Sequence, residues 1–382
     1  MKKFVWLCLM ALLLNGFAAA QKHRPPLKDS LDGAFDLSDY IIEANGFVPV
    51  PLIITEPALG GFGGALIPIF LKKRPPYVDT INGKVVRTPV APDITGGMGL
   101  YTVNNTWLVA GFRSGTFVKS RIKYLIGGAY GDINMNFYRT FDQLGEKKLK
   151  FNFKTLPLFV QAIKRIGHSH WYFGLKYLFL KTDVSYAGDT ILNGLAKEFE
   201  SDKVVSQLGT VIELDTRDNV FTPDKGIKFH FDALCSDDFL GSDFDFWRLN
   251  YYMYLYKPFS EKFIAGLRID GQQAFNDPPF YLLPYIDMRG IPAVRYQGNA
   301  DLLSEVEFRW NIKPRWSIML FSGAGKAFNE WDEFGDADWV WSYGTGFRYL
   351  LARKFKLRVG IDVAHGPDTW AYYIVFGSTW LK

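Results

Sequence analysis

The residues that could perform acid–base or nucleophilic chemistry do not form a catalytic set in this sequence. The histidines are His23, His168, His170, His230 and His365. A hydrolase needs a nucleophile or an acid–base pair within reach of its substrate, and no G-x-S-x-G motif is present. His365 lies near Asp368, and we interpret this pair as an ordinary turn at a strand end. We therefore expect no catalytic residue, no metal and no cofactor.

Charged residues instead recur at alternate positions, which predicts strands with one polar face. Successive side chains of a strand point to opposite faces. The sets that share a predicted polar face are Glu305, Glu307, Arg309 and Asn311; Lys148, Lys150, Asn152 and Lys154; Lys228, His230 and Asp232; Arg268, Asp270 and Gln272; and Lys356, Arg358 and Asp362. Val306, Phe308 and Trp310 form the opposite face of the first set. In a membrane barrel the polar faces would line a wet lumen.

Sixteen segments of this kind follow one another, separated by turn residues. They are Phe47–Thr55, Gly61–Leu71, Ile94–Val103, Trp107–Phe117, Ile122–Tyr138, Leu149–Ile166, Trp171–Tyr186, Val204–Leu214, Ile227–Leu234, Phe246–Tyr256, Phe263–Phe275, Leu303–Ile312, Trp316–Ala327, Val340–Leu350, Phe355–Val363 and Trp370–Trp380. Short turns alternate with longer loops, as in outer-membrane barrels. The long connection Lys72–Pro92 is the exception, and an error there would make the count fourteen.

The first residues predict export. Lys2 and Lys3 precede an apolar stretch, and Ala18–Ala20 offers a cleavage site, so residues 1–20 read as a signal peptide. Only Cys235 remains after cleavage, which excludes an internal disulfide. Residues 21–46 are a polar periplasmic lead-in, and residues 47–382 are the barrel domain.

Composition favours a membrane barrel over a soluble two-layer sheet, which would show the same alternation. Aromatic residues make up 17% of the chain, and membrane interfaces select them. After the signal no run of about 18 apolar residues could form a spanning helix. The net charge of +5 is mild and no basic cluster suggests nucleic acid. We expect an all-β, antiparallel, sixteen-stranded barrel in the bacterial outer membrane.

Two stretches resemble the BamA/TamA surface-antigen superfamily. Asp215, Arg217 and Asp218, followed by Pro223 and Gly226, are similar to its D-x-R-D…P…G signature, which spans a strand end, a periplasmic turn and the next strand. From the residues alone, this stretch is either an ordered charge cluster or a turn whose side chains cap backbone groups. Either role is structural.

Arg289 and Gly290 resemble the family's R-G-[FY] motif on a long sixth extracellular loop that folds back into the lumen. If this loop folds inward, its guanidinium needs acceptors. The family often supplies an aspartate in a Phe-x-Asp-x-Gly motif, but this chain has Gly323 at that position. Glu305, Glu307 and Asp362 face the lumen by parity, so we expect Arg289 to contact one or more of them. The alternative is a solvated arginine on the outer surface.

The resemblance implies a protein that assists insertion or passage of a macromolecule at the outer membrane. Its partners would be the lipid bilayer and either an unfolded barrel client or a periplasmic or lipoprotein partner. The lead-in has no room for the POTRA domains that family members usually carry. A passive channel or structural barrel is the alternative, and an outer-membrane enzyme is the third class considered.

Pro49 and Pro51 in the first segment suggest where such a barrel could open. A proline has no N–H to donate, and residues two apart send their N–H groups to the same neighbour. If the depleted edge faces the last segment, closure there has fewer hydrogen bonds than elsewhere. The alternative is that both prolines precede the true strand and stiffen its entry.

Overall fold

This computed structural model describes residues 27–43, 46–81, 83–88, 90–141, 145–188 and 200–380. The predicted signal peptide and its cleavage site lie outside these residues. Within them, no helix is both long enough and apolar enough to span a membrane.

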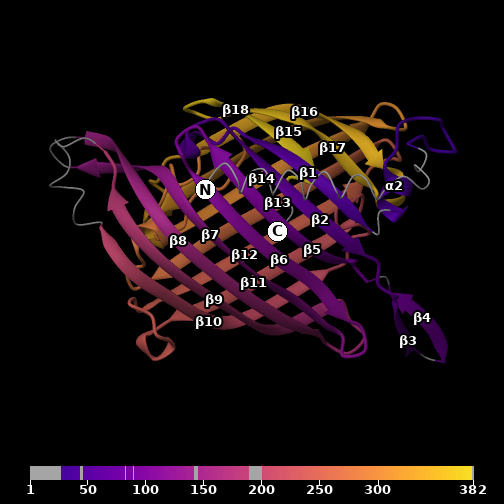
Figure 1. Ribbon diagram of the computed structural model, residues 1–382, viewed down its shortest axis with the longest axis horizontal. Helices are drawn as coiled ribbons and strands as arrows, with labels where there is room; N and C mark the ends of the chain where they lie inside the picture. Colours follow the sequence, from indigo (N-terminus) through magenta and orange to yellow (C-terminus); the bar gives the residue numbers. More distant parts are fainter. Residues whose placement is uncertain are drawn as a thin grey trace, which may run out of the picture.

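One antiparallel sheet of sixteen strands makes up the barrel (Figure 1). Its strands, in sheet order, are β1 (Phe47–Ile54), β2 (Gly63–Lys72), β5 (Asp93–Thr102), β6 (Trp107–Phe117), β7 (Ile122–Phe141), β8 (Gly145–Arg165), β9 (Trp171–Tyr186), β10 (Ser201–Asp215), β11 (Gly226–Ser236), β12 (Phe246–Pro258), β13 (Phe263–Phe275), β14 (Ala300–Asn311), β15 (Trp316–Phe328), β16 (Val340–Ala352), β17 (Leu357–His365) and β18 (Trp370–Phe376). Every strand pairs with its neighbour in the chain, apart from the inserted hairpin described below. The predicted fold class and the count of sixteen strands are confirmed.

The connection Lys72–Pro92 contains a separate hairpin, β3 (Tyr77–Ile81) and β4 (Lys84–Thr88), which projects from one end of the barrel in Figure 1. One strand boundary of the sequence interpretation is wrong. The last strand stops at Phe376 rather than Trp380, because Gly377 adopts a φ of 80° and turns the chain away from the sheet. Glycine reaches this left-handed region without steric cost.

Tryptophans mark both ends of the outer surface. We call the short-turn end the one that carries the connections 118–121, 259–262 and 312–315. The exposed tryptophans near it are Trp171, Trp310 and Trp316, and those near the opposite end are Trp107, Trp247, Trp341 and Trp370. Between them, outward residues such as Val306 and Leu320 are exposed and apolar. Two aromatic girdles around an apolar band are typical of a barrel that faces lipid.

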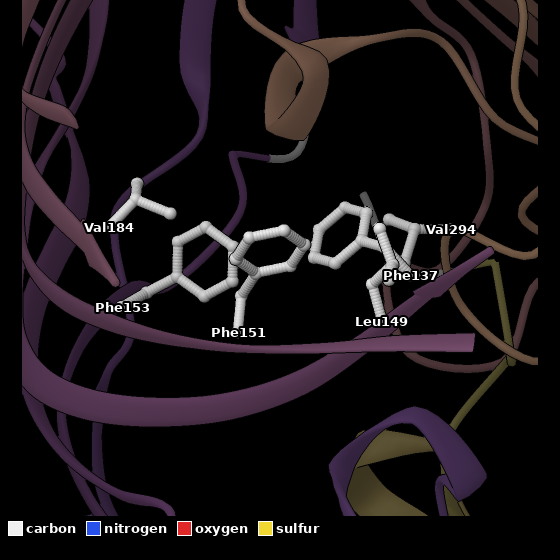
Figure 2. Packing of buried hydrophobic residues seen from close by; sticks show 6 residues of the cluster. All are labelled: Phe137, Leu149, Phe151, Phe153, Val184 and Val294. Atoms are coloured by element: carbon white, nitrogen blue, oxygen red, sulfur yellow. The ribbon is translucent and has the colours of Figure 1, made fainter. Parts of the chain in front are cut away.

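The prediction that Lys148, Lys150, Asn152 and Lys154 face the lumen is wrong, because the three lysines are exposed on the outside and Asn152 is on their side of the strand. Their apolar neighbours Leu149, Phe151 and Phe153 point inward instead; together with Phe137, Val184 and Val294 they form a buried cluster (Figure 2). Strands β7 and β8 have 20 and 21 residues, about twice the 9–11 that cross a membrane. Beyond the lipid, the outer face meets water and the inner face can be apolar.

Helical segments are short. They are α2 (Ser38–Glu43) and the 3-10 turns η1 (Pro57–Leu59), η4 (Asp238–Leu240), η5 (Phe280–Leu282), η6 (Trp331–Phe334) and η7 (Arg353–Phe355). Helix α2 lies at the short-turn end of the barrel (Figure 1), where Ile41 packs with Val48, Leu71 and Leu357. The lead-in thereby packs against this end of the barrel beside β1.

Candidate functional site

Arg289 lies at the centre of the connection between β13 and β14, residues 276–299, and is buried inside the barrel. Its Nε donates to Glu305 Oε1 over 2.7 Å and its Nη1 to Asp362 Oδ2 over 2.9 Å. Glu307 Oε2 also lies 2.9 Å from Nη1. The Phe321 ring is 3.5 Å from the guanidinium carbon. The structure therefore brings Arg289 together with all three carboxylates named from the sequence.

These carboxylates are shared with other parts of the barrel. Arg348 holds Asp362 through two bonds of 2.6 and 2.9 Å. Trp380, in the segment that turns inward after β18, donates its indole N–H to Glu305 Oε2 over 2.8 Å. Both carboxylate side chains are fully buried. One network thus joins the loop, the wall β14–β17 and the C-terminal segment.

Two glycines explain why the acid is on β17 rather than on β15. A Cβ at Gly323 would lie 2.5 Å from Met288 Sδ and 2.9 Å from Ser304 O, so the loop occupies the space of any side chain there. Gly346, which is paired with Asp362, leaves room for that carboxylate, because a Cβ at 346 would collide with Asp362 Oδ1. Phe321 retains the aromatic contact with Arg289.

Gly290 allows the loop to approach the wall closely. Its φ is 85°, and a Cβ would lie 3.0 Å from the His365 carbonyl carbon. Its N–H donates to the Tyr373 hydroxyl over 2.9 Å. This contact joins the loop to β18.

The loop also contacts the opposite wall. Phe280 lies in the ring cluster of β7 and β8, with ring centroids 5.0 Å from Phe137 and 5.2 Å from Phe151. Figure 2 shows the rings of Phe153, Phe151 and Phe137 in a row, with Val294 of the loop beside Phe137. Five strands separate β8 from β14 in the sheet order. The loop therefore crosses the lumen and is attached on both sides.

The sheet is not closed by a ladder between β1 and β18. In the part of the chain that the structure describes, these strands pair only with β2 and β17, and Thr55 Oγ1 donates to Tyr372 O across the gap. Pro49 stands opposite Pro68 in the register with β2, and two prolines cannot form a hydrogen-bonded pair. The N–H positions of 49 and 51 therefore point toward β18, so this edge lacks two donors. We call this gap the seam.

Solved structures contain the same barrel. BamA from Haemophilus ducreyi, in a crystal structure lacking POTRA domains 1–3, matches with a TM-score of 0.54 and 14% identity over 86% of this chain and 68% of that one. The chain has the BamA-type barrel fold.

CdiB barrels share this fold. CdiB from Escherichia coli matches with a TM-score of 0.56 and 11% identity, and CdiB from Acinetobacter baumannii with 0.51 and 9%. Each match covers 86% of this chain, and 62% and 59% of the respective CdiB chains. No family model and no curated protein matches the sequence. These identities establish the fold alone.

In this BamA-type barrel, the motif of Asp215, Arg217 and Asp218 forms the connection between β10 and β11. Arg217 donates to both oxygens of Asp215, over 3.0 and 2.9 Å. Asp218 accepts the backbone N–H groups of Asp224 and Lys225, over 2.9 and 3.1 Å. The motif therefore caps backbone groups and also forms a charge cluster.

This connection also reaches other strands. Lys356, expected on the inward face of a strand, instead precedes β17 with a φ of 53° and donates to Asp218 and Asp224 over 2.7 and 2.8 Å. Arg309 donates to Pro223 O over 3.2 Å, and Phe221 O accepts the Ser378 N–H over 2.6 Å. Gly226, with a φ of 110°, would collide with Thr216 O if it carried a side chain. The turn lies across the short-turn end of the barrel.

Sequence reasoning missed Trp380, Arg348 and the acidic lead-in. Arg315 donates to Asp29, Asp32 and Asp36 over 2.6, 2.7 and 2.5 Å. Hydrogen bonding to Arg353, and to the Leu31 N–H, holds the pKa of Asp29 well below its usual range. The only indication in the sequence was the repeated aspartates at positions 29, 32 and 36. Their partner, Arg315, is 279 or more residues away along the chain, so no local pattern identifies it.

No metal centre is present in the described ranges, where no group of three histidine, cysteine, aspartate or glutamate residues is arranged to hold an ion. His230 donates or accepts at Nε2 against Asp232 over 3.0 Å and stacks on Tyr252. His365 packs between Trp341 and Trp370 in the outer girdle. These histidines serve as wall residues in the structure.

Proposed function

We propose that this protein assists the insertion or translocation of a macromolecule at the bacterial outer membrane, and that the seam between β1 and β18 is where the barrel opens. The observation that carries this proposal is the missing backbone ladder at the seam, together with Pro49 and Pro51 facing the gap. An unpaired strand edge is a template for another strand. A client strand would pair with the remaining groups of this edge.

The position of the loop inside the lumen makes a passive channel the less favoured function. The loop crosses the lumen from the ring cluster on β8 to the carboxylates on β14 and β17. A pore open to ions would need this loop to leave both walls. We therefore rank the channel second, and an enzyme last.

The location forms part of the proposal. Residues 1–20 would be removed near Ala20, residues 21–46 would lie in the periplasm, and residues 47–382 would form the barrel in the outer membrane. Because the backbone groups of the sixteen strands are paired within the sheet everywhere except at the seam, the barrel should resist detergent until heated, and we expect a heat-modifiable gel band in the outer-membrane fraction. A soluble periplasmic protein would contradict the whole proposal.

A reversible disulfide across the seam tests the mechanism. Thr55→Cys and Tyr372→Cys would be combined with Cys235→Ser, since Thr55 contacts the backbone of Tyr372. The readout is the rate at which an unfolded barrel client folds into liposomes containing the protein. We expect oxidation to abolish the acceleration and reduction to restore it.

A second disulfide supplies the control. Val306 and Ser322 are paired in the complete ladder between β14 and β15, so Val306→Cys with Ser322→Cys locks a place that need not open. This variant should remain active when oxidised. If the seam variant is as active when oxidised as when reduced, the seam does not open during function. A large single-channel conductance would then favour the passive channel.

A further inference from the structure

The inner face of the barrel changes character beside the seam. On β11 the buried inward residues are Lys228, His230 and Asp232. On β1 they are Val48 and Val50, followed by Leu52, and β2 adds Ile67, Ile69 and Leu71. An apolar inner wall has no favourable contact with water. It needs an apolar partner.

A cavity of about 490 Å³ lies against this wall. The loop contributes Met288 and Ile291 to its lining, and the C-terminal segment contributes Trp380. Small-molecule sites occupy about 300–1,000 Å³. Along β1 the lining runs from Val48 to Leu52, which corresponds to roughly 13 Å at the rise of a strand. The cavity is mainly apolar.

The cavity borders the seam. Ile374 alternates with Tyr373 and Val375 on β18, so it shares the side of the exposed Tyr372, and it nevertheless lines the cavity. Phe376, at the end of β18, also lines the cavity and packs against the inner apolar cluster of Val48, Val50 and Leu71. No backbone ladder joins β1 to β18 in the described residues. A route from the bilayer to the cavity would therefore pass between these two strands.

Glu56 and Glu305, two carboxylates of the cavity lining, already have donors, whereas the buried Tyr254 hydroxyl of the lining has no hydrogen-bond partner in the described residues. Glu56 accepts the N–H groups of Ala58 and Ala293, over 3.1 and 3.0 Å. Glu305 accepts from Arg289 and Trp380. A buried water needs two to four polar partners, and a peptide would bring backbone groups that need partners too. A hydrocarbon chain needs none.

We propose that this cavity binds one acyl chain of a membrane lipid, which enters from the bilayer between β1 and β18. The chain would lie along the inner side chains of β1 and β2, and it leaves the backbone edge of β1 unoccupied. This inference goes beyond the proposed function, because it applies equally to a barrel without assembly activity.

Photolabelling tests the site directly. The intact protein would be reconstituted in vesicles of phosphatidylethanolamine and phosphatidylglycerol that contain palmitic acid with a diazirine near the chain end. After illumination, labelled residues would be mapped by mass spectrometry. We expect label on inward residues such as Val50 and Ile69, and competition by unlabelled palmitate. Label confined to outward residues would overturn the proposal, as would recovery of a bound peptide in place of lipid.

Matched substitutions on one strand separate the cavity from the outer surface. Val50→Trp fills the cavity and should reduce inward labelling several-fold, whereas Ile53→Trp, on the exposed outward side, should not. Heat-modifiable migration shows that each variant has folded. If Val50→Trp fails to fold, Ile69→Phe takes its place. Unchanged inward labelling in a folded, filled variant would refute the site.

The seam disulfide tests the route. Oxidising Thr55→Cys/Tyr372→Cys before the probe is added should prevent inward labelling, and reduction should permit it. Inward labelling of the oxidised protein would exclude entry through the seam. Because this readout requires no client, loss of the proposed assembly activity would leave it unaffected.

Discussion

Ion pairs of Arg289 hold the loop in its position inside the barrel. The Arg289 guanidinium contacts Glu305, Glu307 and Asp362, and Arg348 offsets part of their charge. Removing one partner of a buried ion pair leaves an uncompensated charge, which costs more than the pair contributes. The network is therefore sensitive to the loss of any member.

Replacing Arg289 should weaken the barrel and free the loop. We expect Arg289→Ala to destabilise the protein by about 3–5 kcal/mol, the usual cost of breaking a buried pair. Arg289→Lys keeps the charge but loses the planar fork, so it should be intermediate. The temperature at which the folded gel band disappears measures both. Identical temperatures for wild type and Arg289→Ala would show that the network contributes nothing.

Restoring an acid at position 323 should harm this protein. Met288 occupies the space above Gly323, so Gly323→Asp should displace the loop and lower the gel transition temperature. Gly323→Ala isolates the steric part and should have a smaller effect. We expect Gly323→Asp not to rescue Asp362→Asn. A rescue would mean that the loop can re-dock on β15.

For single residues, the sequence predicted the inward or outward direction of a side chain where the alternation along a strand determines it. Alternation identified Glu305, Glu307 and Asp362 as inward residues, and the structure places all three against Arg289. Alternation misplaced Lys148, Lys150 and Lys154, because it identifies two faces without saying which is wet. The sequence interpretation placed Trp380 at the end of the last strand, whereas the positive φ of Gly377 carries it out of the sheet.

Among the elements, the lead-in behaves as a strap across the short-turn end. Arg315 contacts three aspartates of residues 29–36, and Leu37 donates its N–H to Leu351 O over 2.8 Å. Helix α2 then leads into β1 beside the seam. The strap thus ties the β14–β17 turns to the first strand.

Removing the arginine should release the strap. We expect Arg315→Gln to speed hydrogen exchange of the Leu37 and Ile41 amides at pH 7, since these belong to the strap. Lys313→Gln, in the same exposed turn, is the control and should leave exchange unchanged. Equal exchange rates in both variants would show that the strap holds through α2 alone.

Acid should release the strap only well below neutral pH. Hydrogen bonds to Arg353 and Arg315 lower the pKa values of Asp29 and Asp32, and the pKa of Asp36 is lowered by Ser38 and Arg315 against the opposing effect of burial. A lowered folded-state pKa gives stability above the unfolded value, about 3.9, and loses it as pH falls through the folded value. A fluorophore on Ile42→Cys, with Cys235→Ser, should respond below about pH 4. Release near pH 6 would contradict this assignment.

The barrel strands could be predicted from the sequence because their side chains alternate over many residues. The hairpin β3–β4 could not be predicted, since each of its strands has only five residues. Asp79, the middle residue of β3, pairs with Arg165 over 3.0 Å. That pair joins residues 86 positions apart. Long-range pairing of this kind leaves no local pattern in a sequence.

For the whole molecule, the lumen is obstructed rather than open. The loop crosses it, and loop residue Asp287 lines both the cavity beside the seam and a second cavity of about 640 Å³, whose lining includes charged residues such as Lys123 and Asp232. Both anchors of the loop must hold for this obstruction to persist.

Weakening the aromatic anchor should increase ion passage. Phe151→Ala with Phe280→Ala removes two rings from the cluster, and burying such rings is worth a few kcal/mol each. We expect small conductance for wild type in a planar bilayer and several-fold larger or noisier conductance for the variant. Lys150→Ala, on the exposed side of β8, is the control. Large, steady wild-type conductance would show that the loop does not obstruct the lumen.

The unequal lengths of the strands have a consequence for the surrounding lipid. β18 has seven residues and β8 has 21. With the usual tilt, seven residues rise only about 18 Å, short of the apolar band of about 25 Å that outer-membrane barrels present. The bilayer beside the seam must become thinner to match the height of β18, and this thinning costs free energy for each ångström. Two barrels that share one thinned region incur this cost once instead of twice. We therefore expect them to associate with their seams facing each other.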